Sequence, residues 1–126
     1  MNTTEITMEQ HRQPSKRRLE AHALALQAAG IILPVAGKIP APMKSVADQL
    51  IRAASSVALN LAEGNGRTGR DRLHHWRIAY GSALETSTAL QILVATGCIR
   101  AEQAARAEAL LDRVRAMTWR LIHPVR

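Results

Sequence analysis

Apolar side chains recur at helical spacing in four stretches of this chain. The stretches run from Leu19 to Leu33, from Val46 to Leu61, from Leu73 to Val94 and from Ala107 to Leu121. A spacing of three and four residues places these side chains on one face of an amphipathic helix. Four such helices joined by short loops pack most simply as a bundle. The pattern therefore predicts an all-α fold, an antiparallel up-and-down four-helix bundle.

Proline and glycine mark the expected ends of these helices. Pro34 predicts that the first helix stops or kinks, because proline removes a backbone hydrogen bond and clashes with the preceding turn. The glycine-rich run over residues 63–69 separates the second helix from the third, and Gly97 ends the third. Residues 1–15 show no apolar period, and we expect them to form a disordered tail. The predicted organisation is this tail followed by a single bundle domain over residues 16–126.

The composition is that of one small helical domain. The 126 residues include no Phe, and the apolar side chains are mainly Ala, Leu, Ile and Val. The single cysteine, Cys98, excludes an intramolecular disulfide. The polar N-terminus lacks the features of a signal peptide, and no stretch approaches the ~20 apolar residues of a membrane span. We therefore expect a cytoplasmic protein that makes no membrane contact.

Three patterns suggest chemistry but lack the partners that the chemistry needs. The glycines within residues 64–69 have the spacing of a dinucleotide-binding loop, but a predicted helix precedes them where that motif requires a strand. Asp71 and His74 are the only near match to the carboxylate–histidine pairs of a di-iron bundle. Nothing in the sequence nominates a base that would activate Cys98. We therefore predict a non-enzymatic protein with no catalytic residues, no metal, no cofactor and no small-molecule substrate.

A polar stripe lies beside the apolar face of the second predicted helix. It consists of Arg52, Ser56, Asn60 and Glu63, and the third helix adds Ser82 and Glu85. Because the third helix returns antiparallel after a short turn, Arg52 should lie near Glu85, and Ser56 near Arg77. Polar groups at a helix seam commonly fix register. We interpret the stripe as a polar clamp or an assembly interface, with an active site as the less favoured alternative.

Basic residues form two clusters that an up-and-down bundle would bring to one end. These residues, called the basic end below, are Lys16, Arg17, Arg18, Arg67, Arg70, Arg72 and Arg77. With 17 Lys and Arg against 10 Asp and Glu, the chain carries a formal net charge of +7. Clustered cations bind phosphate backbones by releasing counterions, so we predict that nucleic acid binds here. A second row, Arg106, Arg113 and Arg120, is interpreted as a solvated face.

Part of the chain resembles a known family of bundles. The residues that carry the likeness are Ser56, Val57, Asn60, Leu61, Ala62, Glu63, Gly64, Arg67, Ala79, Gly81, Ser82 and Glu85. Over them the chain is similar to the four-helix bundle proteins encoded within 23S ribosomal RNA intervening sequences. The resemblance implies a small bundle that assembles into rings, with pentamers expected, and a related group binds nucleic acid as accessory proteins of reverse transcriptases. Two departures from the pattern are Pro34 and the missing Ser or Asp cap at Arg100 and Ala101.

Two functions of different class follow from these observations. The first is a homo-oligomeric interaction or accessory protein that presents its basic end to RNA, DNA or a nucleic-acid enzyme. The alternative is a purely structural, self-assembling bundle that binds no nucleic acid. Both include self-association, because the Ala, Gly and Ser side chains of the third helix offer a second packing surface.

Overall fold

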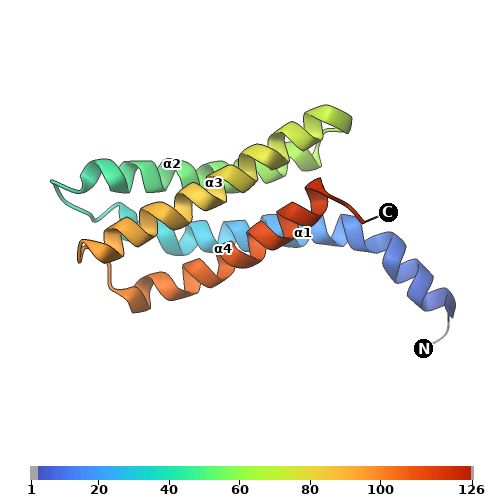
Figure 1. Cartoon of the computed structure of the whole chain (residues 1–126), viewed down its shortest axis with the longest axis horizontal. Coiled ribbons are helices and arrows are strands. Elements are labelled where there is room, and N and C mark those ends of the chain that lie inside the picture. Colours follow the sequence, from blue (N-terminus) through green and yellow to red (C-terminus); the bar gives the residue numbers. More distant parts are fainter. Residues whose placement is uncertain (1–2, 126) are drawn as a thin grey trace.

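Four long helices make up the computed structural model, which describes residues 3–125 and, of these, the side chains of residues 16–125. The helices are α1 (Thr3–Ala36), α2 (Lys44–Asn65), α3 (Gly69–Ala95) and α4 (Ala101–Ile122). Figure 1 shows that successive helices run in opposite directions, joined by loops at alternate ends. The prediction of an all-α four-helix bundle is confirmed.

The helices pack as a closed ring of neighbours. Backbone contacts join α1 to α2, α2 to α3, α3 to α4, and α4 back to α1. Within the described part of the chain, the diagonal pairs α1–α3 and α2–α4 make no such contacts. Because successive helices run in opposite directions, α1 begins and α4 ends at the same end of the bundle as the α2–α3 turn (Figure 1).

The helix ends differ in detail from the sequence-based expectations. α1 continues two residues past Pro34 and ends at Ala36. α3 ends at Ala95, and Gly97 follows with a φ of +79°, a left-handed conformation that favours glycine. α4 begins without a Ser or Asp cap, because the Gln103 side-chain oxygen accepts the Arg100 backbone N–H at 3.0 Å instead.

The N-terminal part of α1 overlaps residues 1–15, for which the sequence predicts a disordered tail. The bounds of α1 extend back to Thr3, whereas the sequence indicates no helix before residue 16. The side chains of residues 1–15 lie outside the described part of the molecule. The division into a tail and a bundle domain therefore stays a prediction.

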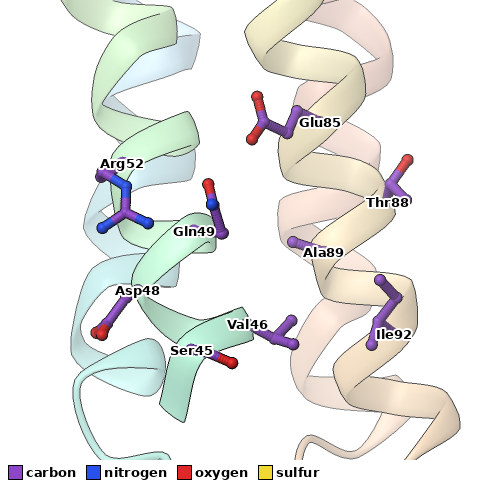
Figure 2. A pocket seen from close by; sticks show the side chains of 9 residues that line it. All are labelled: Ser45, Val46, Asp48, Gln49, Arg52, Glu85, Thr88, Ala89 and Ile92. Atoms are coloured by element: carbon purple, nitrogen blue, oxygen red, sulfur yellow. The ribbon is translucent and has the colours of Figure 1, made fainter. Parts of the chain in front are cut away.

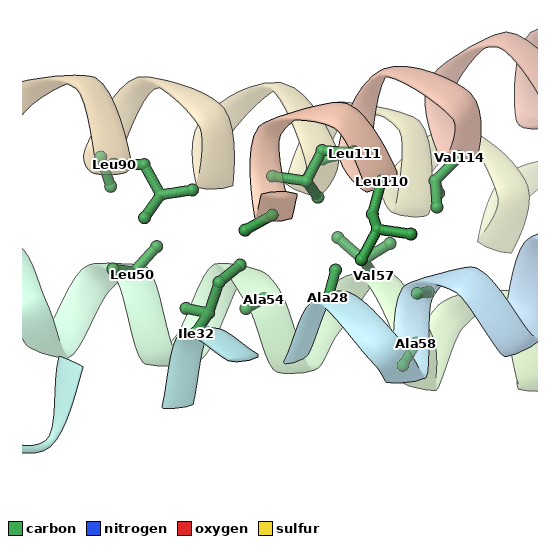
Figure 3. Packing of buried hydrophobic residues seen from close by; sticks show 14 of the residues in the cluster. Ala28, Ile32, Leu50, Ala54, Val57, Ala58, Leu90, Leu110, Leu111 and Val114 are labelled. Atoms are coloured by element: carbon green, nitrogen blue, oxygen red, sulfur yellow. The ribbon is translucent and has the colours of Figure 1, made fainter. Parts of the chain in front are cut away.

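A core of leucine, valine, isoleucine and alanine fills the bundle (Figure 3). The largest side chains that are fully buried are Ile32, Leu50, Val57, Leu61, Thr86, Leu93, Leu111, Val114 and Thr118. The two threonines bury no unpaired hydroxyl, because each donates to the carbonyl oxygen four residues earlier in its own helix, at 2.7 Å. Much of the core is alanine, so the helices approach one another closely.

One described helix segment, residues 16–36 of α1, is long and apolar enough to cross a membrane by length and composition alone. This corrects the expectation that no stretch reaches that length. The segment contributes Ala21, Leu24, Ala28 and Ile32 to the bundle core. Only 39% of the apolar window is buried, and Leu19 and Leu26 of the same segment are exposed.

The small side chains of α3 have a different role from the one expected. Ala79, Ser82, Ala83 and Ser87 are buried within the bundle, so they pack against the neighbouring helices rather than offering a second surface. Of the expected set, Gly81 is exposed. The outward face of α3 instead carries exposed apolar side chains, namely Ile78, Leu84 and Ile92.

Candidate nucleic-acid interface

The two basic clusters lie at the same end of the bundle. The Asn65 side-chain amide, at the end of α2, donates to the Arg18 backbone carbonyl of α1 at 3.4 Å. This contact joins segments 47 residues apart in the sequence. The part of α1 around Arg18 is thus placed beside the end of α2, where the second cluster begins.

Arg67 is neutralised by two carboxylates. Its guanidinium contacts the Glu63 carboxylate at 3.2 Å and the Asp71 carboxylate at 2.7 Å. The hydrogen bond from Arg67 holds the pKa of the Asp71 carboxyl below its ordinary value, so that Asp71 stays ionised to lower pH. Arg67 therefore bridges the turn and contributes little free charge.

Arg72 caps the end of α2. Its Nε donates to the Gly64 carbonyl oxygen at 2.9 Å, and its guanidinium donates to the Asn65 carbonyl oxygen at 3.4 Å. The Gly64 carbonyl oxygen also accepts the Arg67 backbone N–H at 3.2 Å, so Arg72 adds a second donor there. A cation at this position also complements the negative end of the helix dipole. The guanidinium carbon also lies 5.4 Å from the centre of the Trp76 ring. Arg72 is consequently committed to the fold.

Four cations of the basic end remain available for a ligand. In the described part of the chain, Lys16, Arg17, Arg70 and Arg77 have no hydrogen bond or ion pair from their side chains. All but Arg17 are exposed, and Arg17 is half-buried. The structure thus separates Arg67 and Arg72, which hold the turn together, from the exposed cations Lys16, Arg70 and Arg77. Arg17 and Arg18 are half-buried.

The polar stripe forms a chain of hydrogen bonds across the α2–α3 seam. Ser82 donates to Ser56 between their hydroxyls at 2.8 Å, and the Asn60 amide donates to the Ser56 hydroxyl at 3.0 Å. His75 Nδ1 lies 3.0 Å from the Asn60 side-chain oxygen, which can only accept, so this nitrogen carries the proton. The sequence did not single out His75, although its position fifteen residues after Asn60 fits an antiparallel pair about the turn.

Of two pairings predicted for this seam, that of Ser56 with Arg77 is wrong and that of Arg52 with Glu85 is weaker than expected. Ser56 lies against Ser82 and not against Arg77, because the turn is centred farther along the chain than the sequence suggests. Arg52 and Glu85 face the same groove (Figure 2), but within the described residues neither side chain forms an ion pair. Both are exposed, so their coupling should be small.

The groove between α2 and α3 has a volume of about 650 Å³. Val46, Ala89 and Ile92 give it an apolar lining, with Arg52 and Glu85 on opposite helices (Figure 2). It lies along the half of the seam that is farther from the basic end, because Ser45 and Ile92 are near the α1–α2 and α3–α4 loops. The groove is therefore distinct from the basic end.

Gly64 is required by packing and not by a turn. It lies inside α2, and a Cβ placed on it would come within 2.4 Å of the Trp76 ring. The helix of Trp76 can approach α2 only where the side chain is absent. The sequence assigned Gly64 to a flexible turn, because nothing in it shows that the Trp76 ring packs against this position.

The fold and the site together define a small all-helical bundle with a polar α2–α3 seam and a cationic end. The family model of the 23S rRNA-intervening sequence protein matches residues 17–120. The chain belongs to that family, as the sequence resemblance implied.

A solved structure has the same fold. It is a protein of unknown function from the S23 ribosomal protein family of Bacteroides thetaiotaomicron, with a TM-score of 0.76 and 21% sequence identity. The match covers 84% of this chain and 97% of the other. No curated protein matches this chain. The structural likeness therefore establishes the bundle fold, and function has to be argued from the side chains of this chain.

Proposed function

We propose that this protein is a non-enzymatic, homo-oligomeric accessory protein of the cytoplasm that binds nucleic acid through its basic end. The observation that carries the proposal is the convergence of two clusters distant in sequence, held together by the contact between Asn65 and Arg18. The nearby carboxylates of Glu63 and Asp71 are engaged by Arg67. The three groups together leave one negative charge, which is too little to offset the cations Lys16, Arg70 and Arg77.

Phosphate contacts would supply the binding energy. Each cation that neutralises a phosphate releases condensed counterions, so affinity falls as salt rises. Such contacts carry no sequence information by themselves. We expect binding of similar strength to different base sequences, with a steep dependence on salt.

Self-association would multiply this surface. The exposed apolar side chains Leu59, Ile78, Leu84 and Ile92 on α2 and α3 supply area for a subunit interface. The family resemblance implies a ring, with five subunits expected. Repetition of the basic end would raise avidity, so a modest affinity per subunit suffices.

Replacing Arg70 and Arg77 together by Ala tests the proposal. These side chains hold no described partner, so the fold should survive. Binding to RNA and DNA is measured across a salt series for wild type and variant. We expect weaker binding to all sequences and a slope in log affinity against log salt that is shallower by about two.

The matched control replaces Lys38 and Arg106 by Ala. It removes the same charge from exposed positions near the opposite end of the bundle. The control should keep the wild-type slope. Absence of binding by the wild type near 50 mM salt, or equal slopes in both variants, would contradict the proposal and favour the purely structural bundle. The solution mass decides the oligomer separately, and a monomer at high concentration would contradict self-association.

A further inference from the structure

An exposed aromatic cluster lies on α4 near the basic end. Trp119 is 51% exposed, an unusual position for a tryptophan in a chain with so few aromatics. Its ring centre lies 3.8 Å from that of His123, with the planes inclined by 32°. Tyr80 of α3 lies 5.9 Å away with its plane tilted by 49°. Trp119 therefore presents a flat aromatic surface, and the imidazole of His123 stacks on it.

A hollow of about 470 Å³ lies beside Trp119 between α3 and α4. Its lining residues are Tyr80, Asp112, Arg115, Ala116, Trp119 and Arg120. Arg115 is paired with Asp112. Arg120 is exposed and, within the described residues, has no hydrogen bond or ion pair from its side chain. An aromatic face and an available cation thus occur together in one concave surface.

The hollow continues the basic surface along α3. Arg77 lies three residues before Tyr80, and Arg70 lies seven residues before Arg77, so both fall close to the same outer face of the helix. The ten residues from Arg70 to Tyr80 span ~15 Å of helix axis. A single polynucleotide strand could contact these cations with its phosphates and reach Trp119 with a base.

We propose that the Trp119 ring and the hollow beside it together form a base-stacking site for single-stranded nucleic acid. The proposal rests on the proposed function and adds the class of ligand to it. A base stacks on the face of Trp119 that His123 now covers, and Arg120 contacts the adjoining phosphate. Single strands are favoured because their bases are free to stack on a protein ring, whereas duplex bases already stack on one another.

His123 can leave this position at small cost. It follows Ile122, the last residue of α4, and is exposed. Its side chain makes one further polar contact, from Nδ1 to the Trp119 carbonyl oxygen at 3.2 Å. The backbone N–H of His123 also donates to this oxygen, at 2.8 Å, so the carbonyl keeps a partner when the imidazole moves. The imidazole therefore serves as an exchangeable cover of the ring.

The test compares Trp119→Ala with wild type on an oligouridylate single strand and on an RNA duplex of equal length. Affinity is measured at two salt concentrations, with the intrinsic fluorescence as a second readout. Wild type should bind the single strand more tightly and lose Trp119 fluorescence on binding. Trp119→Ala should lose about 10-fold in affinity for the single strand, keep its duplex affinity, and retain the salt slope.

Three further variants separate stacking from other causes. Trp119→Phe keeps a ring and should lose less than Trp119→Ala, and His123→Ala should bind at least as tightly as wild type. Leu26→Ala removes an apolar side chain that is 52% exposed on α1 and should change nothing in binding. Equal losses for Leu26→Ala and Trp119→Ala, or a loss for His123→Ala as large as that for Trp119→Ala, would overturn the proposal.

The remaining outcomes distinguish this proposal from the function on which it rests. If wild type binds single strand and duplex equally and Trp119→Ala changes neither, the stacking site is refuted while the basic end stands. If Trp119→Ala lowers the oligomeric mass without changing the preference for single strands, the hollow is a contact between copies of the chain, and the stacking site is again refuted. Absence of any nucleic-acid binding refutes both.

Discussion

The α2–α3 and α1–α4 interfaces hold the same bundle together by different means. Between α2 and α3, a chain of hydrogen bonds runs from His75 through Asn60 and Ser56 to Ser82, and Gly64 admits the Trp76 ring. The α1–α4 interface has apolar side chains and an exposed ion pair, Glu20 with Arg113 at 3.3 Å.

The two interfaces differ in how strongly they specify the register of the helices. Hydrogen bonds between particular atoms and a contact that only glycine permits are lost on a shift of one turn. Apolar side chains of similar volume can be repacked after such a shift. We therefore expect α2–α3 to fix the geometry of the basic end, and α1–α4 to contribute stability that depends mainly on buried volume.

Leu111→Ala should lower the free energy of unfolding most, because it removes volume from the apolar core beside α4. Leu111 is 1% exposed, and its truncation leaves a cavity as well as losing burial. The free energy of unfolding should fall by roughly 2–5 kcal/mol. Urea denaturation measures the change, with the exposed Leu26→Ala expected within about 0.5 kcal/mol of wild type. Similar losses for the two variants would contradict the assignment of Leu111 to the core.

Gly64→Ala should destabilise the seam by roughly 1–3 kcal/mol, because the added Cβ overlaps the Trp76 ring. Gly81→Ala is the matched control, since its Cβ meets nothing within 4 Å at an exposed position of α3, and it should stabilise by about 0.5–1 kcal/mol. In a Trp76→Phe background the cost of Gly64→Ala should shrink. An unchanged cost in that background would show that the contact with Trp76 is not its cause.

Asn60→Ala should cost about 1–2 kcal/mol, because it breaks the hydrogen-bond chain in the middle and leaves His75 and Ser56 with fewer partners. A double-mutant cycle with Ser82→Ala measures whether the chain acts as one unit. Additive effects would indicate independent bonds and weaken the contrast between the two interfaces.

Truncating Glu20 and Arg113 should change the free energy of unfolding less than the substitutions above. The pair is exposed, so its coupling energy should lie below about 1 kcal/mol and should fall as salt rises. A double-mutant cycle at two salt concentrations measures it. Arg52 and Glu85, which form no ion pair in the described structure, should show less coupling still. A salt-independent coupling above 1 kcal/mol for Glu20 and Arg113 would mean that the α1–α4 interface also depends on specific polar contacts.

The sequence was a good guide to the elements of this fold and a poorer one to the partners of individual side chains. The periodic apolar positions identified four helices, because amphipathic periodicity depends only on residues that are near in sequence. The shared position of the two basic clusters followed from the up-and-down topology. The register predicted between α2 and α3 was displaced from the one in the structure. The sequence therefore paired Ser56 with Arg77, whereas Ser56 contacts Ser82.

The candidate site shows the same division. Lys16, Arg70 and Arg77 were available from the sequence and remain available in the structure. Arg67 and Arg72 could not be told from them, because all are arginines near one turn. Their commitment to Glu63, Asp71 and the end of α2 depends on side-chain geometry. The sequence did not single out Trp119, because the apolar spacing of the fourth helix does not show that this ring is exposed.

The number of helices, the all-α class, the family and the gathering of positive charge at one end could all be predicted from the sequence. These properties follow from local periodicity, composition and the order of the elements along the chain. The tertiary structure alone decided which cations are free, why Gly64 must be glycine and where an aromatic face meets an available arginine. The physical reason is that such contacts join atoms from different helices, and a displacement of a few ångströms between helices exchanges one set of partners for another.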